Sequence, residues 1–239
     1  MVRYLDLSQP LSPLTPRSTD HPEVRFPVSR WYSRNGTKTR TIEASLHAGT
    51  HLDTAALFFP DGETVDKVDV NRLIGNGVFI DCRLKKWEAI TAEHLEQRAP
   101  DVGKDDIPVL CTGWHHHYYD EETYELLAPG LDKSGIDWLA AKGPKCFCVD
   151  SPSAEHIFMR FKQWQLTRPD IFGNVSPDFT KFPPAYGHKT LLPKGIIMVE
   201  GLGGHIDELI GKRAKIFILP AMYQGVEAAP CRVVAELPG

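Results

Sequence analysis

Two histidines and an aspartate stand within seven residues of one another in the segment LHAGTHLDTAAL, residues 46–57. On a helix, His47 and His51 would share a face, but Asp53 would lie on the far side. In an extended chain, where side chains alternate, the three donors and Gly49 all point the same way, and the glycine leaves space between them. Two imidazoles and one carboxylate suit Zn, Mn or Fe. The spacing therefore predicts an extended segment that carries half of a metal site.

A structural role is the alternative for these three residues. A single histidine is more often a partly buried, hydrogen-bonded residue than a ligand. Two histidines and an aspartate on one face, around a glycine, favour the metal site instead.

The composition is that of a globular protein and excludes several classes of function. The 239 residues are 42% hydrophobic and 24% charged, with a formal net charge of -4, and the basic residues are scattered. A nucleic-acid surface needs clustered Lys and Arg, so none is expected. No apolar run approaches the roughly 20 residues of a membrane span, and the N-terminus lacks the apolar region of a secretory signal.

The five cysteines indicate a reducing compartment. Their number is odd and their positions are scattered, which is not the pattern of a disulfide framework. Cys146 and Cys148 are too close for a C-x-x-C pair, and alternation within KCFCV predicts buried thiols on a strand. We therefore expect a cytoplasmic protein.

Short apolar segments alternate with helical ones along the chain. Strands are expected at 39–45, 77–82, 107–113, 145–150, 195–201 and 215–220, and helices at 91–99, 134–143 and within 151–165. Thr91 and Glu93 suit a helix start, and Gly143 suits a helix end. The alternation predicts an α/β domain with a central, mostly buried sheet.

The motif HAGTHLD resembles the H-x-G-T-H-x-D signature of the cyclase family, the metal-dependent hydrolases that include bacterial kynurenine formamidase and isatin hydrolase. The resemblance covers nearly the whole chain. Further similar segments are YLDLSQPLS near the start, FFPDGETVD after the motif, CTGW (111–114), CVDSPSAE (148–155) and HKTLLPKGIIMVEGLGG (188–204). It implies one domain over residues 1–239, with the swivelling β/β/α type of α/β fold.

The resemblance also implies a metal set in two halves. His47, His51 and Asp53 match the first half, and His188 and Glu200 match the second. The sequence supports the position of Glu200, which ends the apolar run GIIMV, because a carboxylate at the end of a buried strand is costly unless a cation neutralises it. One or two divalent ions, Zn or Mn, are expected, and Asp53 would bridge two ions.

The chain departs from the family pattern just after the motif. The family signature continues D-x-P-x-H, whereas this chain has Ala55 at the proline position and Leu57 at the histidine position. In formamidase-type members that histidine is assigned to proton transfer or to completing the site. Leucine can neither carry a proton nor bind a cation, so the usual reaction is in doubt.

Three explanations of Leu57 remain open. A bound cation can lower the pKa of its water toward neutrality without help from a side chain. Another histidine can substitute, and the candidates are His116, within the run 115–117 after a strand, and His205; a polar surface turn is the alternative for that run. The chain can also have lost hydrolysis. Trp114, at a family position, is either a wall of the substrate pocket or a core residue.

The resemblance implies a metal-dependent hydrolase that acts on the C–N bond of an amide, formamide or cyclic amide. Water activated by the metal would attack the carbonyl, and arylformamidase activity on N-formylkynurenine is the nearest named reaction. The partners expected are a small-molecule substrate and further copies of the chain in a homo-oligomer, with no nucleic acid and no membrane. A metal-dependent lyase or isomerase and a non-catalytic small-molecule binding protein are the alternatives.

Overall fold

A closed sheet forms the centre of the protein in the computed structural model, which describes residues 1–99 and 101–237. Its strands are β1 (Arg3–Asp6), β4 (His51–Asp53), β5 (Ile74–Asp81), β7 (Asp106–Cys111), β9 (Cys146–Val149), β10 (Ile197–Glu200), β11 (Arg213–Pro220) and β12 (Ala228–Leu237). They are ordered β1-β12-β11-β5-β7-β9-β10-β4, and β12 also pairs with β4. Seven strands therefore close into a barrel, and β1 adds to β12 from outside.

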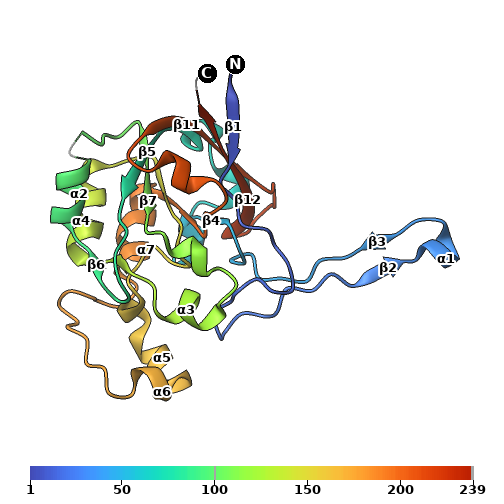
Figure 1. The fold of residues 1–239 in the computed structure, drawn as a ribbon, viewed down its shortest axis with the longest axis horizontal. Helices are drawn as coiled ribbons and strands as arrows, with labels where there is room; N and C mark the ends of the chain where they lie inside the picture. The colour runs from blue at the N-terminus through green and yellow to red at the C-terminus, as the bar shows by residue number, and fades with distance from the viewer. Residues whose placement is uncertain (100, 238–239) are drawn as a thin grey trace.

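The strands β5, β7, β9 and β10 are parallel neighbours, so each connection between them must cross back over the sheet. The helices in these connections are α2 (Ala92–Arg98), α3 (Glu121–Leu126), α4 (Lys133–Lys142), α5 (Phe161–Thr167), α6 (Pro169–Phe172) and α7 (Tyr186–Leu191). Helices α2 and α4 cover one side of the barrel (Figure 1). The α/β class expected from the alternation is confirmed.

Two apolar cores lie on the two faces of the barrel wall. One cluster takes residues from all seven barrel strands, among them Leu52, Val109 and Val199, and fills the interior. A second cluster combines the outward residues of the parallel strands, such as Met198, with helix residues such as Leu139. Successive residues of a parallel strand therefore pack into different cores, because side chains alternate between the two faces of the sheet.

Short elements complete the body. The 3-10 turns are η1 (Ala55–Leu57), η2 (Val65–Lys67), η3 (Val70–Arg72), η4 (Trp114–His117), η5 (Ile157–Arg160), η6 (Leu192–Lys194) and η7 (Ile206–Leu209), and β6 (Ala89–Ile90) pairs with β8 (Gly130–Leu131). No helix among the described residues is long and apolar enough to cross a membrane.

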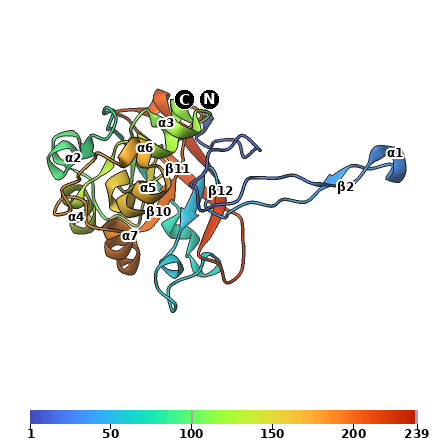
Figure 2. The same ribbon diagram turned by 90° about the horizontal axis from the view of Figure 1, so that it is seen from below.

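An arm projects from the body near the N-terminus. It consists of β2 (Val28–Arg30), the short helix α1 (Tyr32–Asn35) and β3 (Thr39–Arg40), and β2 and β3 pair antiparallel. Both views of the ribbon show it standing clear of the barrel (Figures 1 and 2). Residues 29–43, which include the tip of the arm, are all exposed.

Most of the expected helices and strands are confirmed. The exceptions lie where contacts with distant residues determine the secondary structure. The strands expected at 77–82, 107–113, 145–150, 195–201 and 215–220 correspond to β5, β7, β9, β10 and β11, and Cys146 and Cys148 are buried on β9. The Thr91 side chain caps the start of α2, and Gly143, in the left-handed conformation, ends α4.

One expected element is wrong in extent. The strand predicted at 39–45 is only the two-residue β3 in the exposed arm, because only Thr39 and Arg40 pair with β2, outside the barrel. The short helix predicted within 151–165 is confirmed as η5 followed by α5, and the residues before 157 form a loop at the end of β9.

Candidate metal centre

The pairing of β4 with β10 brings three of the predicted donors onto one face of the barrel wall. The strands are antiparallel, with Glu200 opposite His51 and Met198 opposite Asp53. Side chains directly opposite one another point to the same side of a sheet, so both carboxylates and the imidazole face outward. All three side chains are buried, at most 6% exposed.

The expected extension of the whole segment 47–53 is wrong. Only residues 51–53 form a strand, and His47 lies in a turn that Gly49 makes possible with a φ of 67°. The turn still returns the His47 side chain to the site, because its Nδ1 lies 2.9 Å from Asp53 Oδ1. The prediction that the three donors converge is therefore met by a different backbone path.

The donors from distant parts of the chain meet around Asp53. His51 Nε2 lies 3.6 Å from Asp53 Oδ1 and 3.7 Å from Glu200 Oε2, and His188 Nε2 lies 3.7 Å from Asp53 Oδ2. These distances are too long for hydrogen bonds. They approach the edge, about 3.4 Å, of a tetrahedron whose centre lies about 2.1 Å from each corner, the usual zinc–ligand distance.

The donors of this site fit a divalent cation. The donors form two groups of three, His47 with His51 and Asp53, and Asp53 with His188 and Glu200, and within each group the ligand atoms lie within 4.8 Å of one another. Asp53 Oδ1 is buried, and no described residue gives it a well-aligned hydrogen bond, although His47 Nδ1 lies 2.9 Å away. A buried carboxylate oxygen without an aligned donor is costly, and a cation would satisfy it. Asp53 belongs to both groups, as a bridging ligand would.

Neighbouring groups orient the donors for this role. His51 Nδ1 lies 2.9 Å from the carbonyl oxygen of Gly49, to which it donates, so that Nε2 is left with a free lone pair. Glu155 accepts from the backbone N–H of His188 at 2.9 Å and lies 3.2 Å from its Nδ1. Glu200 Oε1 accepts from the backbone N–H of Ala154 at 2.8 Å.

Electrostatic interactions among the donors favour mixed protonation states. Burial would raise the pKa of Asp53, but His51 and His188 outweigh it and hold that pKa far below its usual range. Burial and the charge of Asp53 raise the pKa of Glu200. Burial would lower the pKa of His188, but Glu155 and Asp53 hold it well above its ordinary value. Protons thus occupy part of the space that a cation would take, and metal binding must release them.

A cavity of about 390 Å³ opens onto these donors. Its volume lies in the range of small-molecule sites. The cavity is lined by the five donors together with apolar, aromatic and charged side chains, among them Arg17, Tyr118, Tyr124, Glu125 and Arg160. A small polar molecule can therefore reach the donors.

Two of the lining residues bear on proton transfer in the cavity. Leu57 faces the space, so the position at which the family carries a histidine is adjacent to the donors. His21 also lines the cavity, and its ring centroid lies 5.7 Å from that of His47. Burial lowers the pKa of His21. The motifs did not identify His21, which lies outside every matched segment, or Glu155, which ends the segment CVDSPSAE but is not among the predicted site residues.

The structure does not bring the other candidates to the cavity. His116 and His205 are exposed, and each pairs with a carboxylate, Asp207 and Glu208 respectively. Trp114 is buried in a small cluster with Tyr118 and Tyr124, and its indole N–H reaches backbone oxygens of α3. Trp114 therefore supports two residues of the cavity wall from behind.

Comparison with known proteins gives consistent matches. A family model described as cyclase matches residues 5–156. Kynurenine formamidase of Erythrobacter litoralis is 26% identical over 239 residues, covering 99% of this chain and 95% of that protein.

Solved structures share the fold over the full length. An isatin hydrolase bound to the product analogue thioisatinate has a TM-score of 0.80 at 21% identity, covering 100% of this chain and 93% of that chain. Isatin hydrolase A from Labrenzia aggregata has a TM-score of 0.81 at 20% identity, covering 100% and 94%. The α/β fold implied by the resemblance is confirmed.

Glu125 should make stability fall as the pH rises. Burial raises the pKa of this carboxyl from 4.5 to about 8, so between these values the folded state keeps a proton that the unfolded chain has lost. The stability contributed by this proton is complete at low pH and is lost as the pH rises toward 8. The variant Glu125→Gln stays neutral, so urea denaturation should show its stability rising relative to the wild type between about pH 5 and about pH 8.

The matched control is Glu43→Gln, at an exposed position away from this helix. Its difference from the wild type should stay constant over this pH range. Parallel stability profiles for the wild type and the Glu125 variant would contradict the raised pKa of this partly buried carboxyl.

Proposed function

The chain belongs to the cyclase family, and on that premise we propose that it is a metal-dependent hydrolase that cleaves the C–N bond of an amide, formamide or cyclic amide. The observation that carries this proposal is the convergence of His47, His51, Asp53, His188 and Glu200 at one cavity. The matched proteins named kynurenine formamidase and isatin hydrolase support it.

Each of the five donors would have a defined part in holding the metal. His47 and His51 would serve one ion with Asp53, while His188 and Glu200 would serve a second ion through the same aspartate. Zn and Mn suit this set of nitrogen and oxygen ligands. A bound cation supplies a nucleophilic water near neutral pH and polarises the carbonyl to be attacked.

The remaining residues of the cavity would position the substrate and move protons. A departing amine needs a proton, and Leu57 cannot supply it. We assign this transfer to His21 rather than to His116 or His205, because His21 is the one that lines the cavity. The arylformamidase reaction is the nearest named one, and the change at Leu57 makes fast turnover of N-formylkynurenine unexpected. Five free thiols, four of them buried, support a cytoplasmic location.

Replacing one donor should remove metal and activity together. His51→Ala takes away an imidazole that lies 3.6 Å from Asp53 and 3.7 Å from Glu200, so metal content measured by mass spectrometry should fall. Hydrolysis in a screen of formamides, lactams and lactones should be lost with it.

The matched control is His94→Ala, which alters a histidine at the start of α2 and should retain both metal and turnover. Unchanged metal content in His51→Ala would remove this residue from the ligand set. Metal binding without turnover of any amide would instead favour a binding protein or a lyase.

Restoring the missing histidine should raise formamidase activity. Leu57 lines the cavity, so the imidazole of Leu57→His would face the substrate, and general acid–base catalysis is worth about 100-fold or more. We expect kcat on N-formylkynurenine to rise at least about tenfold. Leu57→Asn is the control, since its amide is polar but does not exchange a proton near neutral pH. Equal gains in both variants, or rapid turnover by the wild type, would show that this position is not decisive.

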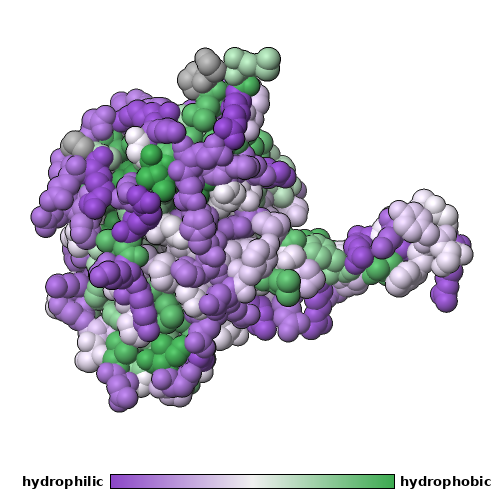
Figure 3. All heavy atoms as spheres, viewed as in Figure 1, coloured by the Kyte–Doolittle hydropathy of each residue, from purple (hydrophilic) through white to green (hydrophobic). Residues whose placement is uncertain are grey.

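We also propose that the chain forms a homo-oligomer through its arm. Trp31, Tyr32 and Ile42 are 54%, 70% and 53% exposed, and an isolated two-stranded ribbon is marginally stable in water. Figure 3 shows the arm as a thin projection, with apolar atoms where it leaves the body. A second copy that packs against the arm would bury these side chains.

Light scattering should show the purified chain as a dimer or a larger assembly. A variant with Trp31→Ala and Tyr32→Ala should shift toward the monomer, because it loses the largest apolar surface of the arm. Tyr223→Ala, at a position 41% exposed outside the arm, should leave the mass unchanged. A monomeric wild type would contradict the proposal.

A further inference from the structure

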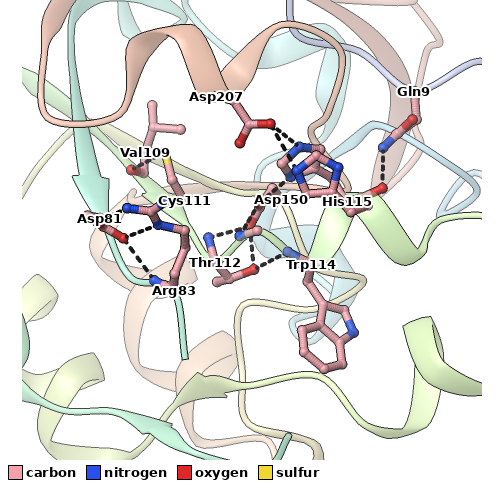
Figure 4. Close-up of polar contacts among 12 residues, drawn as sticks. Gln9, Asp81, Arg83, Val109, Cys111, Thr112, Trp114, His115, Asp150 and Asp207 are labelled. Atoms are coloured by element: carbon pink, nitrogen blue, oxygen red, sulfur yellow. Dashed lines mark hydrogen bonds and ion pairs between the residues drawn. The ribbon is translucent and has the colours of Figure 1, made fainter. Parts of the chain in front are cut away.

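A second group of potential ligands lies away from the cavity, where the turn η4 meets η7. It consists of His115 and His116 from η4 and Asp207 from η7. Asp207 Oδ2 lies 3.5 Å from His115 Nε2 and 2.9 Å from His116 Nε2. Figure 4 shows Asp207 above the ring of His115, with Asp150 on the other side of that ring. None of the three residues lines the cavity of the first site.

The buried histidine of this group is oriented like a metal ligand. Its Nδ1 lies 2.7 Å from Asp150 Oδ2, and this carboxylate is fixed in turn by hydrogen bonds from Thr112 and from the backbone N–H of Gly113. Since Asp150 holds the proton on Nδ1, His115 presents a lone pair on Nε2. A carboxylate behind the imidazole is the usual arrangement at metal-binding histidines.

The Nε2 atom of His115 faces Asp207 Oδ2 at 3.5 Å, which is too far for a good hydrogen bond. The side chain of His115 is only 6% exposed, and its Nε2 makes no hydrogen bond with any described residue. A buried nitrogen in this state costs free energy unless something binds it. This nitrogen faces the carboxylate of Asp207 across a distance suited to a shared cation.

We propose that His115, His116 and Asp207 bind a borderline divalent cation such as Zn²⁺ at a second, structural site. Nitrogen and oxygen donors of this kind select such ions over Mg²⁺ or Ca²⁺. The separation of 3.5 Å between His115 Nε2 and Asp207 Oδ2 matches the tetrahedral edge of about 3.4 Å that zinc–ligand bonds produce. His116 must retreat from Asp207 by roughly half an ångström, and its exposed side chain is free to do so.

The charges around the site also favour a cation. Asp150 and Asp207 place two carboxylates beside imidazoles that are neutral when they act as ligands. The nearby Arg83 does not neutralise them, because its guanidinium is held by Asp81 at 2.9 and 2.6 Å. A dication therefore balances the two carboxylates, and water or another small ligand would complete its coordination.

The place of the site in the fold explains what the ion does. η4 follows the end of β7 and η7 follows β10, so the ion joins two connections directly, and a third through Asp150, which follows β9 and holds His115. Tyr118 comes directly after η4 and lines the cavity of the first site. The ion held by His115, His116 and Asp207 thus fixes a wall of the cavity without touching the substrate.

Zinc titration of the metal-free full-length protein tests this proposal. The wild type should bind one equivalent more than His116→Ala or Asp207→Asn, with the affinity at that site at least about tenfold weaker in each variant. Both positions are exposed, with side chains 63% and 48% accessible, so the variants should fold. Zn²⁺ should also raise the Tm of the wild type by more than it raises theirs.

Three further variants separate this site from surface binding and from the first site. His117→Ala and His205→Ala remove exposed histidines of the same region and should keep the extra equivalent. His51→Ala should lose zinc at the first site and keep it at the second, whatever reaction the first site performs. Equal stoichiometry in the wild type, His116→Ala and Asp207→Asn would overturn the proposal, as would an equal loss in His117→Ala.

Discussion

The repulsion between two buried carboxylates is the constraint on which this site depends. Asp53 and Glu200 stand on neighbouring strands, on one face of the wall, with almost no contact with solvent. Two negative charges in such a place are tolerated only if protons, imidazolium groups or a cation compensate them. The surrounding histidines do part of this, and the groups that hold them, Glu155 and the carbonyl of Gly49, turn their Nε2 atoms toward the carboxylates rather than away. This polar cluster is therefore stable only if positive charge compensates the two carboxylates.

Barrel closure is what brings the two halves of the site together across about 150 residues of sequence. β4 is only three residues long, yet it pairs with β10 on one side and β12 on the other. The chain just before β4 packs tightly on the end of β10: Thr50 Oγ1 donates to the carbonyl of Gly201 at 2.6 Å, and a Cβ at position 201 would lie 2.5 Å from the oxygen of Gly49. Glycines at these two positions therefore let the ligand-bearing segments approach each other.

Local pattern was enough to predict the parallel strands, because their apolar runs are buried on both faces. It was not enough for β12, which closes the barrel, since Pro230 interrupts its pattern and only pairing with β4, β11 and β1 makes it a strand. The metal donors could be predicted because the first three share one motif and the resemblance supplied the others. His21 could not, because it lies far from that motif and reaches the cavity only through the path of the N-terminal segment. The extended conformation predicted for 47–53 was wrong, because a turn at Gly49 brings His47 to the same site as His51 and Asp53.

The two clusters of donors share one origin in the fold. β7, β9 and β10 are parallel, so their carboxyl ends lie at the same end of the barrel, where side chains leave the sheet and backbone groups are free to bind. Glu200 ends β10, Asp150 follows β9, and His115 follows β7. Alternation along β10 sends Glu200 to the outer face and into the first site, whereas the turn after β7 carries His115 toward η7. A barrel that gathers three strand ends can hold a reactive cation on one side and a structural cation on the other, since different connections supply the ligands of each.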